Sequence, residues 1–161
     1  MFKKTVLYLE NFHFTYNAIL ASKPNKLEKI YSAFAIALRK SRDKEETQII
    51  IKSRLIDPLE KIFPSYEEFR LRFVELTFSK DKENATNIKA KYVINRLHCL
   101  YSGKEVYEQD GSIEHLVSET TGGKTLNIGN LILLELSINT DAGDRSYTDK
   151  ISFYRESQGN L

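Results

Sequence analysis

The stretch Ser112-Ile113-Glu114-His115-Leu116-Val117 places an acid directly before a histidine in a short run with β-branched residues. Such a run, bounded by turn residues, predicts a strand. A second short run, Val106-Tyr107, precedes it, and Asp110-Gly111 lies between the two. Asp-Gly between two such runs is typical of a β-hairpin turn. The sequence therefore predicts a hairpin whose second strand carries Glu114 and His115.

Further turn and helix signals follow this hairpin toward the C-terminus. Gly122-Gly123 indicates a flexible loop, and Asn127-Ile128-Gly129-Asn130 has the composition of a turn. A brief apolar run from Leu131 to Leu134 comes next, and then a polar stretch with helical character at residues 137–142. Residues 147–157 predict a terminal helix. The chain after residue 105 thus combines short strands with short helices.

The chain before Gly103 has the pattern of helices, because its apolar residues recur at three- and four-residue steps. Ser65 and Glu68 have the spacing of a capping box, and Pro58 should kink or interrupt the helix that contains it. The helices are expected over residues 2–21, from an N-cap at Asn25 to residue 38, over 45–63, from the cap at Ser65 to residue 76, and over 88–101. We therefore expect an α+β fold that is mainly α, with a helical subdomain at residues 1–105 and a second subdomain at 106–161.

Length and composition exclude several classes of protein. The 161 residues suit one domain or two small subdomains, and 41% hydrophobic with 29% charged residues is ordinary for a folded chain. No apolar run approaches the ~20 residues that span a bilayer, and Met1-Phe2-Lys3-Lys4 lacks the features of a signal peptide. The single cysteine, Cys99, excludes an internal disulfide and a cysteine-rich zinc site. We expect a cytoplasmic protein with no membrane segment.

The net charge of +2 conceals an uneven distribution. Residues 106–161 hold four Lys or Arg and nine Asp or Glu, a net charge of −5, which leaves +7 for residues 1–105. A basic part joined to an acidic part fits a polyanion-binding body with a cation-binding site. The same distribution also fits ordinary solvated faces, so both interpretations stay open.

The acidic part contains residue types that suit metal-assisted hydrolysis. Glu114 and Asn139 offer a carboxylate and an amide carbonyl, and hard divalent cations prefer such oxygen ligands. His115 suits a general base near neutral pH. A metal and a base together suffice to hydrolyse a phosphodiester. Either Arg145 or Lys150 would help to neutralise the phosphate.

Each of these residues also has a purely structural interpretation. A lone histidine on a short strand is commonly structural, Asn130 beside Gly129 fits a turn, and Asn139 fits a helix cap. Moreover, adjacent residues of a regular strand point to opposite faces. Glu114 and His115 therefore share a site only if a bulge or a strand end lies there.

The segments that carry these residues resemble, in order and spacing, the HNH nuclease domain at the C-terminus of GmrSD-type restriction proteins. The most specific part is Ile128-Gly129-Asn130-Leu131-Ile132-Leu133-Leu134, with Asn139 nine residues after Asn130. Other matching segments are Ser112 to Val117, Ser137-Ile138-Asn139, Asp144 to Tyr147 and Lys150. A weaker likeness extends into the helical region, at residues 25–34, 63–69 and 91–97.

The resemblance implies a ββα-metal (HNH) unit at residues 106–161, preceded by an N-terminal helical bundle. In such a unit His115 would be the general base, while Glu114 and Asn139 would bind Mg²⁺ or Mn²⁺. Asn130 would complete the catalytic set by holding the loop between the elements with hydrogen bonds. The ββα geometry would also bring Glu114 and His115 to one site.

The resemblance further implies a metal-dependent endonuclease that acts on nucleic acid, with DNA as the expected substrate, in bacterial anti-phage defence or restriction. Specificity would come from a partner ATPase or GTPase, or from a ParB-like subunit. The sequence departs from the family pattern in three ways. Val117-Ser118 stands where a proline is usual, and Lys124 is the only basic residue between the histidine and the asparagine. The turn has Asp144-Arg145 where the family has an Asn-Lys pair. Two alternatives therefore stay open, a catalytically decayed interaction subunit with an HNH fold and a nuclease that cleaves RNA or tRNA.

Overall fold

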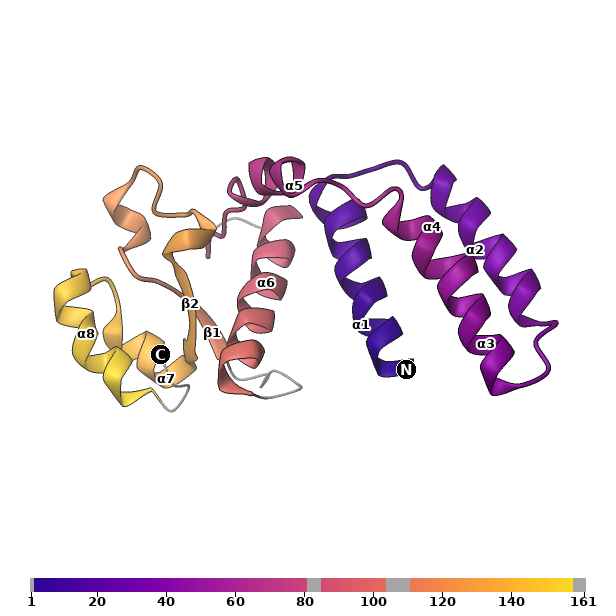
Figure 1. Ribbon diagram of the computed structural model, residues 1–161. Coiled ribbons are helices and arrows are strands. Elements are labelled where there is room, and N and C mark those ends of the chain that lie inside the picture. Colours follow the sequence, from indigo (N-terminus) through magenta and orange to yellow (C-terminus); the bar gives the residue numbers. More distant parts are fainter. Residues whose placement is uncertain (1, 81–84, 104–110, 158–161) are drawn as a thin grey trace. The chain divides into compact units, whose positions relative to one another are not determined.

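The computed structural model describes residues 2–80, 85–103 and 111–157. The chain forms two compact units, residues 1–73 and residues 74–161 (Figure 1). The described part of the first unit is built from helices, and the second unit combines helices with a two-stranded sheet. The expected α+β class, mainly α, is therefore confirmed.

The first unit begins with a long helix that is continuous in the chain. The α-helix α1, Phe2–His13, runs directly into the π-helical segment η1, Phe14–Ile19, as the sequence predicts. After a turn, α2 spans Asn25–Leu38. Pro24, and not Asn25, holds the N-cap position, and its carbonyl accepts from the backbone N–H of Leu27 and Glu28. The predicted N-cap at Asn25 is thus wrong by one residue, because the fixed φ of proline already suits a helix start.

The next helix changes its hydrogen-bonding pattern near Pro58, as predicted. It consists of α3, Lys44–Ile50, the π-helical segment η2, Ile51–Ile56, and α4, Asp57–Glu60. Asp43 caps its start by accepting from the backbone N–H of Glu46 at 2.8 Å. Proline has no N–H to donate and its ring excludes the carbonyl one turn earlier. The wider π spacing just before Pro58 accommodates both effects.

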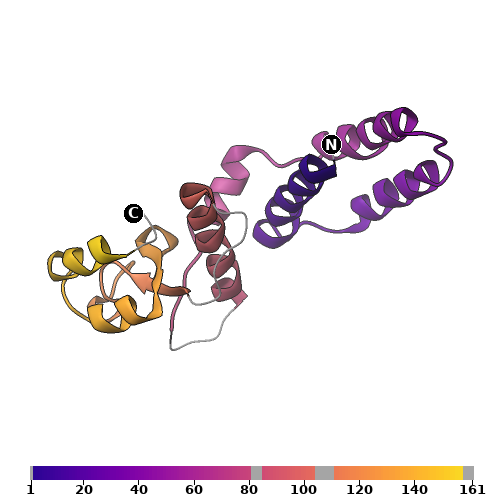
Figure 2. The same ribbon diagram turned by 90° about the horizontal axis from the view of Figure 1, so that it is seen from below.

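An apolar core joins these helices. Phe12, Tyr16, Leu27, Leu55 and Leu59 are buried together, so α1, η1, α2, η2 and α4 all contribute to it. The helix α2 lies beside the α3–η2–α4 segment, which both views show (Figures 1 and 2).

The last helix of the first unit confirms the predicted capping box. The helix α5 spans Tyr66–Phe73. The backbone N–H of Ser65 donates to Glu68 Oε2 at 2.9 Å, and the N–H of Glu68 lies 3.3 Å from Ser65 Oγ. Hydrogen bonds from Ser65 lower the pKa of the Glu68 carboxyl. The reciprocal pair satisfies two of the free N–H groups at the start of the helix.

The second unit is centred on a small antiparallel sheet. The strand β1, Gly111–His115, pairs with β2, Leu131–Glu135, in a register that places Ile113 opposite Leu133 and His115 opposite Leu131. The predicted hairpin partner, residues 106–107, lies outside the described residues. The described pairing joins β1 to the apolar run Leu131 to Leu134, whose Leu131 and Leu134 are buried.

Three helices accompany the sheet. The helix α6, Ala85–Ser102, contacts β2, while α7, Leu136–Ala142, follows β2 directly and contacts both strands. The helix α8, Tyr147–Glu156, packs against α7. Each was predicted from the sequence within a few residues. The order strand, strand, helix in β1, β2 and α7 is the order that the family resemblance implies.

The connection between the strands contains two short 3₁₀-helices, η3 at Glu119–Thr121 and η4 at Ile128–Asn130. Its end pairs with the chain that enters the second unit. The N–H of Phe78 donates to the carbonyl of Leu126, and the N–H of Ile128 donates to the carbonyl of Leu76, both at 2.9 Å. These bonds fix residues 76–78 beside the strand connection.

The boundary between the units falls at residues 73 and 74, earlier than the expected 105 and 106. The change in sequence pattern after Gly103 marks the start of strands, but α6 and residues 76–78 pack against those strands. They therefore belong to the same compact unit as the sheet. No described helix is both long enough and apolar enough to cross a membrane.

Candidate active site

A polar cavity of about 330 Å³ lies at the end of β1 in the second unit. Side chains from β1, α7, the strand connection and residue 80 line it. Four of the predicted site residues, Glu114, His115, Asn139 and Lys150, line this cavity together. Its other lining residues include Lys80, Ser118, Glu119 and Asp144.

The strand end resolves the objection that Glu114 and His115 should point apart. They do point to different neighbours: Glu114 meets Lys150, whereas the His115 ring lies 6.0 Å from the ring of Phe78, measured between centroids. However, β1 ends at His115. Because the sheet does not continue beyond this residue, both side chains border one cavity.

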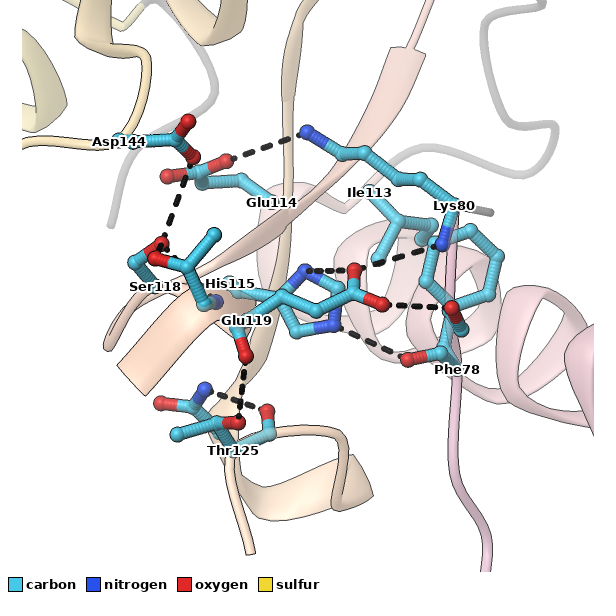
Figure 3. A network of polar contacts seen from close by, with 12 residues as sticks. Phe78, Lys80, Ile113, Glu114, His115, Ser118, Glu119, Thr125 and Asp144 are labelled. Carbon is cyan, nitrogen blue, oxygen red and sulfur yellow. Dashed lines mark hydrogen bonds and ion pairs between the residues drawn. The ribbon is translucent and has the colours of Figure 1, made fainter. Parts of the chain in front are cut away.

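Glu114 is a buried carboxylate whose two oxygens face different cations. Its side chain is 2% exposed, and Oε1 lies 2.6 Å from the Nζ of the equally buried Lys150. The Tyr154 hydroxyl donates to the same oxygen at 3.4 Å. Burial raises the pKa of Tyr154, and the nearby Glu114 carboxylate raises it further, so the hydroxyl keeps its proton. The second oxygen, Oε2, lies 3.7 Å from Lys80 Nζ (Figure 3).

Asn139 presents its amide oxygen to the cavity. The residue is 4% exposed on α7, and its Nδ2 donates to Ser112 Oγ at 2.8 Å and to the carbonyl of Ile113 at 3.0 Å. A backbone carbonyl only accepts hydrogen bonds, so the amide nitrogen must face β1. The Oδ1 atom consequently points away from the strand, where it accepts from Lys80 Nζ at 3.3 Å.

The ring of His115 is held in one tautomer by a backbone carbonyl. Its Nε2 lies 3.0 Å from the carbonyl oxygen of Phe78, and the side chain is almost fully buried. Since that oxygen cannot donate, Nε2 carries the proton and Nδ1 has the free lone pair. The Nδ1 atom lies 3.8 Å from Glu119 Oε2 (Figure 3).

Glu119 is itself held in place from the segment at residues 78–80. The Ser79 hydroxyl donates to Glu119 Oε1 at 2.5 Å, and the N–H of Lys80 lies 3.4 Å from Oε2. Residues 78–80 therefore supply four polar groups to the site, namely a carbonyl for His115, a hydroxyl and a backbone N–H for Glu119, and the Lys80 ammonium.

Asn130 holds the strand connection, in the position that the resemblance implies. Its Oδ1 accepts from the N–H of Val117 at 2.9 Å, while Nδ2 donates to the carbonyls of Val117 and Thr125 at 2.8 and 2.7 Å. The side chain thus ties Val117, two residues after β1, to the loop before β2. It does not border the cavity that Glu114 and His115 share.

We expect Asn130→Ala to destabilise the protein by about 1–3 kcal/mol, because it leaves one backbone N–H and two carbonyls without their partner. The measurement is urea unfolding followed by circular dichroism. The control Asn95→Ala replaces the same side chain within α6, where alanine has high helix propensity. Equal stability of the two variants would show that the three bonds of Asn130 contribute little.

The two predicted phosphate-binding residues are engaged within the fold. Lys150 is 1% exposed and is committed to Glu114, and it also donates to the carbonyl of His115 at 3.2 Å. Arg145 donates to the carbonyls of Asp141 and Ala142 at the end of α7 and covers the ring of Phe153. The structure shows Lys150 holding Glu114 at the wall of the cavity, and phosphate binding by Lys150 and Arg145 stays a prediction. Arg145 closes α7 in the described conformation.

Sequence reasoning missed several groups that line the site. Lys80, the Phe78 carbonyl and Ser79 reach it only through tertiary structure, whereas Glu119 lies four residues after His115. Lys80 belongs to a polar stretch that predicts no more than a loop, and no local pattern connects it to Glu114. The pair Lys150 and Tyr154 did have a usable signal, because residues four apart on a helix share one face.

The donor atoms suit a hard divalent cation. Glu114 Oε2 and Asn139 Oδ1 both lie within 3.7 Å of one positively charged nitrogen, so the two oxygens already surround a cation position. Among the residues that the structure describes, no group of three or more His, Cys, Asp or Glu is arranged to hold a metal. An ion here would have one carboxylate and one amide from the protein, with water or phosphate oxygens completing its shell, which is the usual mode of Mg²⁺.

The fold and the site define a small α+β domain with an acid, a histidine and a carboxamide around one polar cavity. The chain belongs to the family of the C-terminal domain of GmrSD restriction endonucleases, whose family model matches residues 63–161. The match covers α5 and the whole second unit, but not the weaker likeness noted at residues 25–34. No curated protein and no solved structure matches the chain.

Proposed function

We propose that this chain is a metal-dependent endonuclease of the HNH type, which hydrolyses phosphodiester bonds in nucleic acid with DNA as its substrate. The observation that carries the proposal is the gathering of Glu114, His115 and Asn139 around one cavity in a domain of a restriction endonuclease family. The acid is buried, the histidine is fixed in one tautomer, and the amide oxygen of Asn139 faces the cavity. A purely structural core does not require these three features together.

His115 is the general base in this proposal. The Phe78 carbonyl retains the Nε2 proton, which leaves the Nδ1 lone pair to accept a proton from a water molecule. The ring becomes positively charged when it accepts that proton. The Glu119 carboxylate, 3.8 Å from Nδ1, then stabilises the imidazolium.

Glu114 and Asn139 are the proposed ligands of Mg²⁺, or of Mn²⁺ with the same oxygen preference. Lys150 and Tyr154 hold Glu114 Oε1, and this leaves Oε2 directed toward the cation position. The β1 backbone similarly holds the amide nitrogen of Asn139 and leaves Oδ1 directed inward. A bound divalent cation supplies charge neutralisation at the scissile phosphate and at the leaving oxygen.

Charge distribution supports nucleic acid as the substrate. Residues 1–73 hold fourteen Lys or Arg and nine Asp or Glu, a net charge of +5 for the first unit. Such a unit attracts the phosphate backbone without reading its sequence. We propose that specificity comes from a partner, an ATPase or GTPase or a ParB-like subunit, within a restriction or anti-phage system.

Metal dependence tests the proposed function directly. We expect the full chain to cleave plasmid DNA with Mg²⁺ and to lose this activity in EDTA. Asn139→Ala should raise the Mg²⁺ concentration needed for half-maximal cleavage by about tenfold or more, because one oxygen ligand is lost. The Mg²⁺ requirement of the control Asn95→Ala should be unchanged.

Testing DNA and RNA as substrates separates the proposed function from its two alternatives. Cleavage of RNA but not of plasmid DNA would establish the RNA-cleaving alternative. Absence of cleavage of both substrates, with Mg²⁺ and with Mn²⁺, would favour the interaction subunit with a decayed site. Cleavage that persists in EDTA would contradict the metal-dependent mechanism.

A further inference from the structure

Two lysines approach the same carboxylate, and they differ in burial. Lys150 is 1% exposed and contacts Glu114 Oε1 at 2.6 Å, within the fold between β1 and α8. The Lys80 side chain is 49% exposed and approaches Oε2 at 3.7 Å from the open side of the cavity. Lys150 is therefore fixed by packing, whereas the Lys80 ammonium has solvent on one side.

The Lys80 ammonium occupies the position that the two inward oxygens define. Its Nζ is the donor to Asn139 Oδ1 at 3.3 Å. The same atom lies 3.7 Å from Glu114 Oε2 (Figure 3). These are the two oxygens whose partner atoms, Nδ2 and Oε1, are already held by the fold. One cation of the protein itself thus stands where both proposed ligands point.

From this geometry, and resting on the function proposed above, we infer that Lys80 is a resident counter-ion of the Glu114–Asn139 pair that a divalent cation must displace. An ammonium and a divalent cation cannot share two oxygens at these distances, because like charges repel strongly at about 4 Å in a partly buried site. Binding of the metal therefore moves the Lys80 side chain out toward solvent.

The backbone of Lys80 stays in place during this exchange. Phe78 donates its N–H to Leu126 and its carbonyl accepts from His115, and Ser79 is bound to Glu119 and Asn87. Only the side chain of Lys80 has to move. The displaced ammonium remains tethered beside the cavity, where it is placed to pair with a phosphate of the substrate.

Lys80 thereby links two states of the site. Without metal, the ammonium offsets the charge of a carboxylate that is 2% exposed. With metal, the same ammonium becomes available to an anionic ligand. Metal binding and phosphate binding are coupled through one side chain, and the coupling acts in both directions.

Metal binding by the full chain tests this inference without measuring cleavage. Free Mn²⁺ is followed by electron paramagnetic resonance while wild type, Lys80→Gln and Lys124→Gln are titrated. Lys124 is an exposed lysine in the strand connection, so its substitution makes the same change in charge away from the cavity. We expect Lys80→Gln to bind Mn²⁺ about tenfold more tightly than wild type, and Lys124→Gln to bind within about twofold of it.

The direction of the effect makes the test decisive, because a variant that is merely misfolded loses affinity. If wild type binds Mn²⁺ and Lys80→Gln binds it equally or more weakly, the proposed role of Lys80 is wrong. The proposed metal site would still hold in that case. Equal tightening in Lys124→Gln would reduce the effect to net charge and would also overturn it. Absence of Mn²⁺ binding in every variant would overturn the proposed metal site together with the inference.

Discussion

His115→Gln should lower the rate of DNA cleavage by about 10²–10⁴-fold while the protein stays folded. The glutamine side chain has a terminal N–H₂ that can replace Nε2–H as the donor to the Phe78 carbonyl, but it has no lone pair able to take a proton at neutral pH. Single-turnover cleavage of supercoiled plasmid at saturating Mg²⁺ measures the loss, since saturation removes any effect on metal affinity.

Two further variants separate chemistry from folding. His115→Ala should lose the same activity but also some stability, because it leaves the Phe78 carbonyl without its donor and opens a gap beside the Phe78 ring. His98→Gln makes the same substitution at a histidine of α6 and should cleave at the wild-type rate. Full activity of a folded His115→Gln protein would rule out His115 as the base.

Local signals in the sequence account for most of the helices. The capping box of Ser65 and Glu68 needs only residues three apart, and the interruption at Pro58 follows from the missing N–H of one residue. The π-helical form of that interruption had no comparable signal. The segment η2 also packs against α2, a contact that a single sequence does not reveal.

The pairing of β1 with β2 joins residues that are far apart in the sequence. Asp110-Gly111 is a strong local turn signal, so the sequence directed attention to residues 106–107 as the partner of β1. The described partner is β2, which lies beyond a connection of fifteen residues that contains η3 and η4. Leu131 and Leu134 of β2 are buried, and burial is a property of the whole unit, so no local pattern predicts this pairing.

The residues of the candidate site likewise include some that the sequence could identify and others that it could not. Glu114, His115, Asn130 and Asn139 could be named from residue types together with a family resemblance, and the structure places three of them around one cavity. Of the groups that hold them, only Lys150 was named from the sequence, and it was named for phosphate binding. A backbone carbonyl such as that of Phe78 has no sequence signature, and lysine is normally solvated, so the burial of Lys150 runs against expectation for its residue type.

The buried ion pair between Lys150 and Glu114 should dominate the stability of the second unit. Lys150→Met leaves a carboxylate that is 2% exposed without its 2.6 Å partner, and an unpaired buried charge costs about 3–5 kcal/mol. Lys80→Met removes the other lysine from the same carboxylate, yet it should cost less than about 1 kcal/mol, because Lys80 is 49% exposed and lies at 3.7 Å. Urea unfolding in EDTA measures the free energy of unfolding of both variants, each of which removes one lysine from the same carboxylate.

A double-mutant cycle isolates the pair itself. Glu114→Gln alone strands the buried ammonium of Lys150 and should be destabilising to a similar degree, whereas Lys150→Met combined with Glu114→Gln removes both charges. We therefore expect the double variant to recover most of the stability that either single variant loses. If the two single losses simply add, the ion pair is not the source of either loss. Lys150 would then stabilise the protein through the packing of its hydrocarbon stem against β1. The ion pair at Glu114 Oε1 would not be what directs Oε2 toward the cavity.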